Sequence, residues 1–370
     1  MASRGRFELP DPELNRQLET LLDDVEAKLG PAESREAVRQ LMVAALRLVS
    51  DRTSRADARL LANAVKEMRH AFRVFAPYEH VRKVAVFGSA RTEPGAPAFE
   101  QARRFGERIA GEGWMVITGA GEGIMAAAQI GAGRAQSFGV NIRLPWEQKP
   151  NAVIDGDPKL VNFRYFFTRK LAFLKEAHAI ALFPGGFGTH DEGFEALTLI
   201  QTGRSEILPV VFVDEPGGRY WRDWSGYVDE HLRRRALVSD ADLSLYRVTD
   251  DVDAAVRETV DFYRNYHSSR FVDDTLVLRV RVAPDATQLA ELNREFADLF
   301  TSGRLEIGPP LPEEGDEVPE HPRVLLRFDR RRAGRLRLLI DRLNQLAPAP
   351  PPSDDASPRA ISEGLPPEAQ

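Results

Sequence analysis

The sequence predicts an α/β protein: a doubly wound parallel sheet, preceded by a helical extension and followed by a small α+β module. Three observations support this prediction. Apolar residues recur at helical spacing in the first 80 residues. Short apolar runs then alternate with helical patterns, as in a parallel sheet whose two faces are covered by helices. From about residue 271 the order of strands and helices changes again. A chain of 370 residues is long enough for two or three domains.

Residues 1–80 are expected to form the helical extension. From residue 11 to residue 78, apolar side chains recur every three or four positions with charges between them. Pro31 predicts the start of a second helix, because proline is tolerated in the first turn. A third helix is expected over Arg55–Phe75. Three amphipathic helices must bury their apolar faces, so we expect this extension to dock on the next domain.

Residues 81–267 are expected to form a Rossmann-like domain. The run KVAVFG, which is followed by Ser89, is typical of a buried parallel strand. Strands are expected at Lys83–Gly88, Trp114–Thr118, Ser137–Ile142, Leu160–Phe163, Ala179–Phe183 and Ile207–Val213, the last of which completes the sheet. Helices are expected at Ala98–Gly111, Gly123–Arg134, Tyr165–Ala177, His190–Thr202, Arg219–Arg235 and Val252–Tyr266.

The end of the chain predicts a small module and a tail. Residues 268–346 are expected to form an α+β module of order βαββα, and residues 347–370, rich in Pro, Ser and acids, a disordered tail. The elements of the module are expected at Thr275–Val282, Ala286–Leu299, Arg304–Ile307, Arg323–Phe328 and Ala333–Leu346.

The composition excludes several classes of site. The chain has no cysteine, which rules out disulfides, zinc–thiolate sites and iron–sulfur clusters. The first residues contain no apolar segment typical of a signal peptide, and no stretch reaches the ~18 consecutive apolar residues of a membrane span. We therefore expect a cytoplasmic protein that binds no membrane. Its net charge is −6 with acids and bases interleaved, so we expect no binding of nucleic acid.

Three glycine-rich loops follow expected strands: Gly88–Arg91, Thr118–Met125 and Pro184–Thr189. Glycine lets backbone N–H groups approach an oxyanion, and a helix N-terminus behind the loop adds unpaired donors. One such loop is explained equally well by the steric needs of a tight turn. Three on the same edge of a sheet favour phosphate binding. The ligand-binding residues expected here are Gly88, Ser89, Gly119, Gly121, Gly123, Gly185, Gly186, Gly188 and Thr189.

Two familiar phosphate-binding classes fit poorly. The second loop partly matches GxGxxG, but no acidic residue is convincingly placed ~20 residues further on to bind a ribose. No Gly-Lys-Ser/Thr occurs at a strand–helix turn, so the P-loop pattern is absent as well.

Acidic residues follow the third loop. Asp191, Glu192 and Glu195 lie on the first turns of the helix behind it. One of them could simply cap that helix, an interaction with the helix dipole that stabilises by roughly 0.3–1 kcal/mol. Three acids would repel a bound phosphate unless they face another part of the ligand. A carboxylate facing a sugar C1′ would stabilise an oxocarbenium ion, as in glycoside hydrolysis. Upstream, Arg169-Lys170 is either the exposed pair of an amphipathic helix or part of this site.

Four motifs in order carry a family resemblance. Pro184–Glu192 resembles the PGGxGTxxE signature of the LONELY GUY (LOG) family, and Arg169-Lys170 resembles its upstream Arg-Lys pair. VFGSAR and TGAGEGIM are similar to the glycine-rich loops of that family. The resemblance extends from about Lys83 to Val213. It implies hydrolysis of the N-glycosidic bond of nucleoside 5′-monophosphates, as in cytokinin riboside monophosphate phosphoribohydrolases and AMP-nucleosidase-like proteins. Some members were mislabelled lysine decarboxylases, a label we reject because no Schiff-base lysine or pyridoxal phosphate site is evident.

The resemblance also implies roles for individual residues. Glu192 corresponds to the catalytic carboxylate and Arg169 to its partner, while Lys170 and the Gly185–Thr189 backbone would hold phosphate. Two positions depart from the short plant-type members, with Asp191 in place of Glu and Gly193 in place of Leu. Asn141–Asn151 resembles a longer bacterial branch, and the base preference stays open. The resemblance implies a homodimer or higher homo-oligomer. No metal or redox cofactor is expected.

The sequence thus predicts an N-glycosidase that converts AMP, or a related purine or cytokinin riboside monophosphate, to free base and ribose 5-phosphate. The alternative is a nucleotide-sensing module that binds its ligand without turnover. The presence of both Arg169 and Glu192 favours the enzyme, because binding alone needs no carboxylate beside a phosphate loop. A third interpretation, an oligomeric scaffold, leaves the four motifs unexplained.

Overall fold

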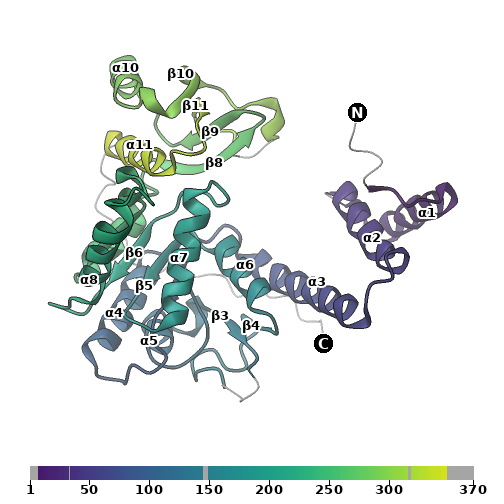
Figure 1. Ribbon diagram of the computed structural model, residues 1–370, viewed down its shortest axis with the longest axis horizontal. Coiled ribbons are helices and arrows are strands. Elements are labelled where there is room, and N and C mark those ends of the chain that lie inside the picture. The colour runs from purple at the N-terminus through teal and green to yellow at the C-terminus, as the bar shows by residue number, and fades with distance from the viewer. Residues whose placement is uncertain (1–6, 33, 145–148, 316–317, 348–370) are drawn as a thin grey trace. The chain divides into compact units, whose positions relative to one another are not determined.

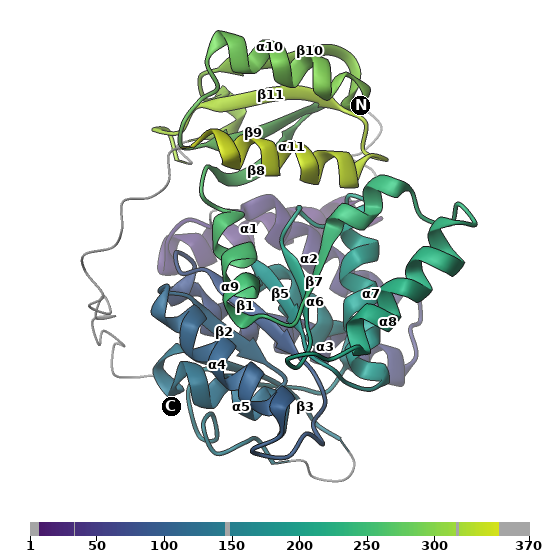
Figure 2. The ribbon, with the colours of Figure 1, turned by 90° about the vertical axis from the view of Figure 1, so that its left-hand side faces the viewer.

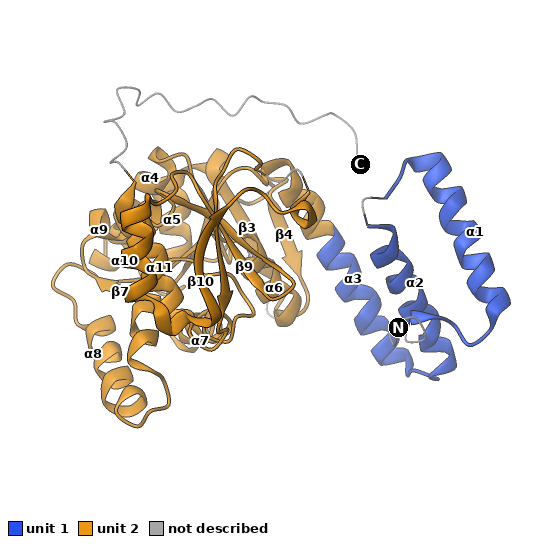
Figure 3. Ribbon diagram, turned by 90° about the horizontal axis from the view of Figure 1, so that it is seen from above, with its two compact units in different colours: residues 1–69 blue, residues 70–370 orange. Residues whose placement is uncertain are grey.

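The computed structural model describes residues 7–32, 34–144, 149–315 and 318–347. The chain divides into two compact units, residues 1–69 and 70–370 (Figure 3). Apart from Ala347, the expected disordered tail lies outside the described residues. Within the described ranges, no helix combines the length and the apolar character needed to span a bilayer. The domain boundaries expected from the sequence stay predictions.

The first unit is helical. It contains α1 (Pro12–Leu29), α2 (Arg35–Ser50) and most of α3 (Arg55–Phe75), the last with the expected bounds. Leu18 and Leu22 of α1 pack with Val43 of α2 in a small apolar core. The prediction that Pro31 starts the second helix is wrong. Gly30 ends α1 at φ 97°, and Pro31 lies in the connection, where proline is common because it cannot continue a helix.

The second unit contains a seven-stranded, wholly parallel sheet of order β4-β3-β2-β1-β5-β6-β7 (Figure 1). This confirms the predicted Rossmann-like, doubly wound class. Apolar side chains from α4, α5 and α9 form one core with β1 and β5, and α6 and α7 lie on the opposite side (Figure 3). The strands are β1 (Lys83–Phe87), β2 (Met115–Thr118), β3 (Ser137–Ile142), β4 (Leu160–Phe163), β5 (Ala179–Leu182), β6 (Val210–Val213) and β7 (Tyr246–Thr249). The helices are α4 (Pro97–Gly111), α5 (Ile124–Ala132), α6 (Phe166–Glu176), α7 (Phe187–Gln201), α8 (Tyr220–Tyr227) and α9 (Val252–Asp261).

Several expected elements of this domain need correction. The strand at β6 does not complete the sheet, because β7 pairs with it as a short edge strand whose polar, partly exposed residues lack an apolar run. The helix α7 begins at Phe187 and not at His190, so the glycine-rich loop itself forms its first turn. The helix expected after β6 ends at Tyr227 and continues as a π-helix, Val228–Arg233.

Close contact between α4 and α5 depends on glycine. A Cβ atom at Gly106 would lie 2.1 Å from the carbonyl oxygen of Ala128, and one at Gly131 would lie 1.8 Å from that of Arg103. Such distances are far below van der Waals contact, so the two backbones touch directly. This packing holds α5, and the second glycine-rich loop before it, against the sheet.

The C-terminal module has the order ββαββα. It comprises β8 (Tyr266–Val272), β9 (Thr275–Val280), α10 (Ala286–Glu295), β10 (Phe300–Gly308), β11 (Arg323–Phe328) and α11 (Ala333–Leu346). Its antiparallel sheet has the order β10-β11-β9-β8 (Figure 2). The predicted order βαββα omits β8, because that strand (YHSSRFV) is polar and mostly half-buried and shows no clean alternation. The expected helix over Ala286–Leu299 ends at Glu295, and the expected helix Val252–Tyr266 ends at Asp261.

Polar contacts tie α11 to the Rossmann-like domain. The Asn344 side-chain oxygen accepts hydrogen bonds from the backbone N–H groups of Asn265 (2.9 Å) and Tyr266 (2.8 Å), and its amide nitrogen donates to the carbonyl of Phe262 at 2.6 Å. A Cβ at Gly334 would lie 2.1 Å from the carbonyl oxygen of Ala241. The module is therefore an integral part of the second unit.

Candidate active site

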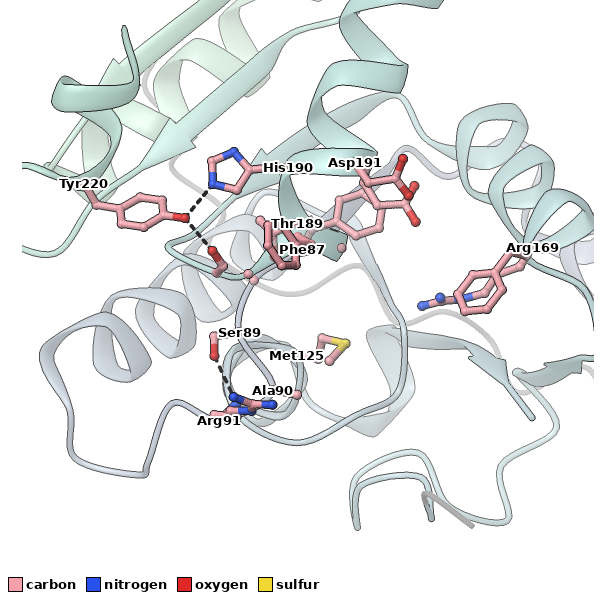
Figure 4. Close-up of a pocket in the computed structure, with 17 residues that line it drawn as sticks. Phe87, Ser89, Ala90, Arg91, Met125, Arg169, Thr189, His190, Asp191 and Tyr220 are labelled. Carbon is pink, nitrogen blue, oxygen red and sulfur yellow. Dashed lines mark hydrogen bonds between the residues drawn. The ribbon is translucent and has the colours of Figure 1, made fainter. Parts of the chain in front are cut away.

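The three glycine-rich loops surround one cavity at the carboxyl ends of β1, β2 and β5. Its volume is about 780 Å³ (Figure 4). In an open parallel sheet this is the edge at which ligands bind, and β1 marks the point where the strand order reverses. The cavity brings together nine of the residues expected from the sequence: Gly88, Ser89, Arg169, Gly185, Gly186, Gly188, Thr189, Asp191 and Glu192.

Some of these glycines let the loops pack on one another. A Cβ at Gly185 would lie 2.2 Å from the hydroxyl oxygen of Thr189. Gly123, at φ 65°, leaves no room for a side chain because the carbonyl oxygen of Ser89 would lie 2.3 Å from its Cβ. That same oxygen accepts a 3.0 Å hydrogen bond from the N–H group of Ile124. The first and second loops are thus locked together, as are the two ends of the third.

Other glycines open onto free space. A Cβ at Gly186 or Gly188 would meet no atom within 4 Å. Gly186 is the N-cap of α7, and its carbonyl oxygen accepts from the N–H groups of Thr189 (3.0 Å) and His190 (3.2 Å). The amides of Gly186, Phe187 and Gly188 donate no hydrogen bond in the described part of the chain. Three consecutive free donors at a helix N-terminus can bind an anion.

Five expected ligand-binding residues do not line the cavity: Gly119, Gly121, Gly123, Lys170 and Glu195. Lys170 is held elsewhere, because its ammonium nitrogen lies 2.7 Å from Asp191 and 2.6 Å from Glu195. Gly119 makes room for Arg169, because a Cβ at Gly119 would lie 2.5 Å from a guanidinium nitrogen of that arginine.

Arg169 enters the cavity from α6. Its Nε donates a 2.9 Å hydrogen bond to the carbonyl of Val140 in β3, and its side chain points into the cavity (Figure 4). Burial lowers the pKa of the guanidinium and the nearby Glu192 raises it. An arginine remains protonated through such changes, so Arg169 is a fixed positive charge.

Glu192 lies on α7 and lines the same cavity. Burial raises the pKa of its carboxyl to about 7, against the opposing effects of Lys170 and Arg169. Among the described residues, no ion pair within 4.0 Å joins Glu192 to Arg169. A carboxyl with this pKa is present in both protonation states at neutral pH. Glu192 can therefore both accept and donate a proton there.

The structure adds residues that sequence reasoning missed. Arg91, Met125 and Phe166 line the cavity, as do His190 and Tyr220. Arg91 and Met125 belong to two of the expected loops, Gly88–Arg91 and Thr118–Met125, and His190 directly follows the third, so their position in the sequence was the available signal. No feature of the sequence pointed to Tyr220, because it follows the third loop by some 30 residues and reaches that loop only through the packing of α8. The remaining lining residues are Phe87, Ala90 and Phe187.

Comparison with known proteins assigns the family. The family model described as "Possible lysine decarboxylase" matches residues 122–259. A cytokinin riboside 5′-monophosphate phosphoribohydrolase of Mycobacterium tuberculosis is 31% identical over 166 residues, which are 42% of this chain and 87% of that protein. The chain belongs to the LOG family. The resemblance recognised in its four sequence motifs is thereby confirmed.

Two further similarities are more distant. A pyrimidine/purine nucleotide 5′-monophosphate nucleosidase of Escherichia coli is 26% identical over 238 residues, 56% of this chain and 52% of the nucleosidase. This LOG-family chain thus spans about half the length of that relative. The molybdenum cofactor binding protein of Rippkaea orientalis is 17% identical, with 48% of this chain and 93% of that chain covered. Its TM-score of 0.34 is too low for any conclusion about function.

Proposed function

We propose that this protein hydrolyses the N-glycosidic bond of nucleoside 5′-monophosphates, AMP or a related purine or cytokinin riboside monophosphate, to free base and ribose 5-phosphate. One observation carries the proposal: the titratable Glu192 shares a cavity, and a helix, with three free backbone amides. The names of the relatives from M. tuberculosis and E. coli, which both specify 5′-monophosphates, support it.

The phosphate binds at the N-terminus of α7. The amides of Gly186, Phe187 and Gly188 donate to its oxygens, and the helix dipole favours its negative charge. Lys170 is a poor candidate for the balancing cation, because two carboxylates already hold its ammonium group. Arg91 is the better one. It is exposed, lines the cavity, and has no carboxylate within 4.0 Å in the described part of the chain.

The reaction takes place further along the same helix. Glu192 follows Phe187 by five residues, a rise of about 7.5 Å, which is comparable with the span of a ribose between its phosphate and C1′. Water adds to C1′ while the C1′–N bond breaks and its electron pair goes to the base. Glu192 accepts a proton from that water, stabilises the positive charge on the sugar, and can pass the proton to the departing base. Arg169, the fixed charge in the cavity, orients Glu192 or polarises the base.

The decisive experiment is an assay of purified full-length protein with AMP and with adenosine, measuring adenine and ribose 5-phosphate. AMP should be cleaved and adenosine should be a poor substrate, because charge-assisted hydrogen bonds to a phosphate contribute about 1.5–3 kcal/mol each. Equal rates on the two compounds would argue against the phosphate site at α7. Binding of AMP without release of adenine would favour the nucleotide-sensing alternative.

A further inference from the structure

The Tyr220 hydroxyl links α8 to the third glycine-rich loop. It donates a hydrogen bond to the carbonyl oxygen of Gly185, and it lies 2.7 Å from Nε2 of His190 (Figure 4). A carbonyl can only accept, so the single hydroxyl proton is committed to Gly185. His190 must then donate from Nε2. This fixes a proton on Nε2 of the imidazole, and the tyrosine hydroxyl donates to Gly185 while it accepts from His190.

Tyr220 is held in place without help from a ligand. At the end of β6, the buried carboxylate of Asp214, 3% exposed, accepts a 3.0 Å hydrogen bond from the N–H group of Trp221 and so anchors the first turn of α8. The rings of Tyr220 and Trp221 pack edge to face at 4.7 Å, and the His190 ring lies 5.4 Å from that of Trp221. The hydroxyl is therefore a pre-positioned donor.

A bond to this carbonyl sets the direction of the neighbouring amide. The peptide between Gly185 and Gly186 is trans, so its C=O and N–H groups point in opposite directions. With the carbonyl held toward Tyr220, the Gly186 N–H group points away from Tyr220 and is left free. Glycine at both positions makes the opposite orientation of this peptide sterically accessible. Without the tyrosine, the carbonyl could turn toward the phosphate and repel it.

Building on the proposed function, we propose that Tyr220 is the positioning residue of the phosphate site. Its hydroxyl keeps the Gly185–Gly186 peptide in the orientation that presents an N–H donor. Because this site contacts only the phosphate group, it binds phosphate independently of the base. Inorganic phosphate and the product ribose 5-phosphate therefore bind there as well as the nucleotide. Accumulating ribose 5-phosphate would consequently compete with the substrate.

The test compares Tyr220→Phe with wild type in the full chain by calorimetry with inorganic phosphate, ribose 5-phosphate and adenosine, and by kinetics with AMP. Phenylalanine keeps the ring packing and removes only the hydroxyl. Phosphate and ribose 5-phosphate should bind about 3- to 10-fold more weakly, the effect of one lost hydrogen bond. The KM for AMP should rise by the same factor, with kcat within about two-fold, and adenosine binding should not change.

Two further variants sharpen the comparison. Tyr227→Phe is the matched control: it lies on the same helix, is half exposed, packs against His231 and does not line the cavity, so its phosphate affinity should equal that of wild type. His190→Gln retains a donor for the tyrosine oxygen and should keep phosphate affinity, whereas His190→Ala should lose part of it. If Tyr220→Phe fails to fold, the two His190 variants test the same hydrogen-bonded link between Tyr220 and the third loop.

Wild-type phosphate affinity in folded Tyr220→Phe would overturn the proposal, as would an equal loss for adenosine, which would indicate general damage to the cavity. A wild-type protein that binds no phosphate would overturn it too. If wild type binds phosphate but does not cleave AMP, the proposed hydrolysis fails, while weaker phosphate binding by Tyr220→Phe would still support the positioning role.

Discussion

Replacing Glu192 with glutamine should strongly reduce turnover and stabilise the protein. Burial raises the pKa of this carboxyl from its ordinary value near 4.5 to about 7. Below pH 4.5 the side chain is protonated in both folded and unfolded chains, so it has no effect on stability. As the pH rises from 4.5 to 7, the unfolded chain ionises first and the folded state becomes relatively less stable. Above pH 7 the penalty is complete, at about 3 kcal/mol.

Glu192→Gln keeps the shape of the side chain and removes this penalty. At pH 8 its free energy of unfolding should exceed that of wild type by up to about 3 kcal/mol, and the difference should vanish by about pH 4.5. Each kcal/mol shifts the Tm by roughly 2–4 °C in a large domain. Turnover of AMP should fall by about 10²–10⁴, because the group proposed to exchange protons at C1′ is lost. Thermal unfolding across this pH range and an adenine-release assay measure the two effects.

Glu195→Gln is the matched control. Glu195 lies on the same helix but outside the cavity, where its carboxylate pairs with Lys170 at 2.6 Å. Its loss should leave turnover within a few-fold of wild type and give no stabilisation at pH 8. Wild-type turnover by a folded Glu192→Gln protein would refute the catalytic role of Glu192. Equal stability of wild type and Glu192→Gln at pH 8 would refute the argument from burial.

Four other variants test separate parts of the site and fold. Arg91→Ala should raise the KM for AMP by about ten-fold or more, because charge-assisted hydrogen bonds to a phosphate are strong. Lys170→Ala should change the KM little. If steady-state kinetics gave the opposite order, Lys170 and not Arg91 would be the residue that binds the phosphate. Gly119→Ala should lower kcat by about ten-fold without unfolding the protein, because the new methyl meets only the ends of two flexible side chains, Arg169 and Met125, and shifts the guanidinium of Arg169. Unchanged kcat would show that the position of that guanidinium is unimportant. Gly131→Ala should destabilise the second unit by about 2 kcal/mol or more in denaturant titrations, because its Cβ would lie 1.8 Å from a backbone oxygen of α4. Wild-type stability of this variant would mean that α4 and α5 separate easily.

Much of the fold was predictable because its signals are local. Five of the six expected strands of the parallel sheet begin and end within about a residue of the observed ones, since buried parallel strands form continuous apolar runs. The strands β7 and β8 escaped prediction because edge strands need no such run, and their identity depends on the neighbour with which they pair. The start of α7 was misplaced for a related reason: a glycine-rich loop is a poor helix former, and tertiary packing overrides that preference.

The sequence by itself determined which loops surround the cavity, because glycines at strand ends and the PGGxGTxxE signature are properties of short contiguous segments. Only the tertiary structure decided what each residue does there. It assigned Gly186 and Gly188 to open space and Gly119 to the support of Arg169, and it joined Lys170 to two carboxylates. It also brought Tyr220 to the carbonyl of Gly185. These roles arise from contacts and desolvation between distant segments, and no periodicity or spacing along the chain records which side chains will meet.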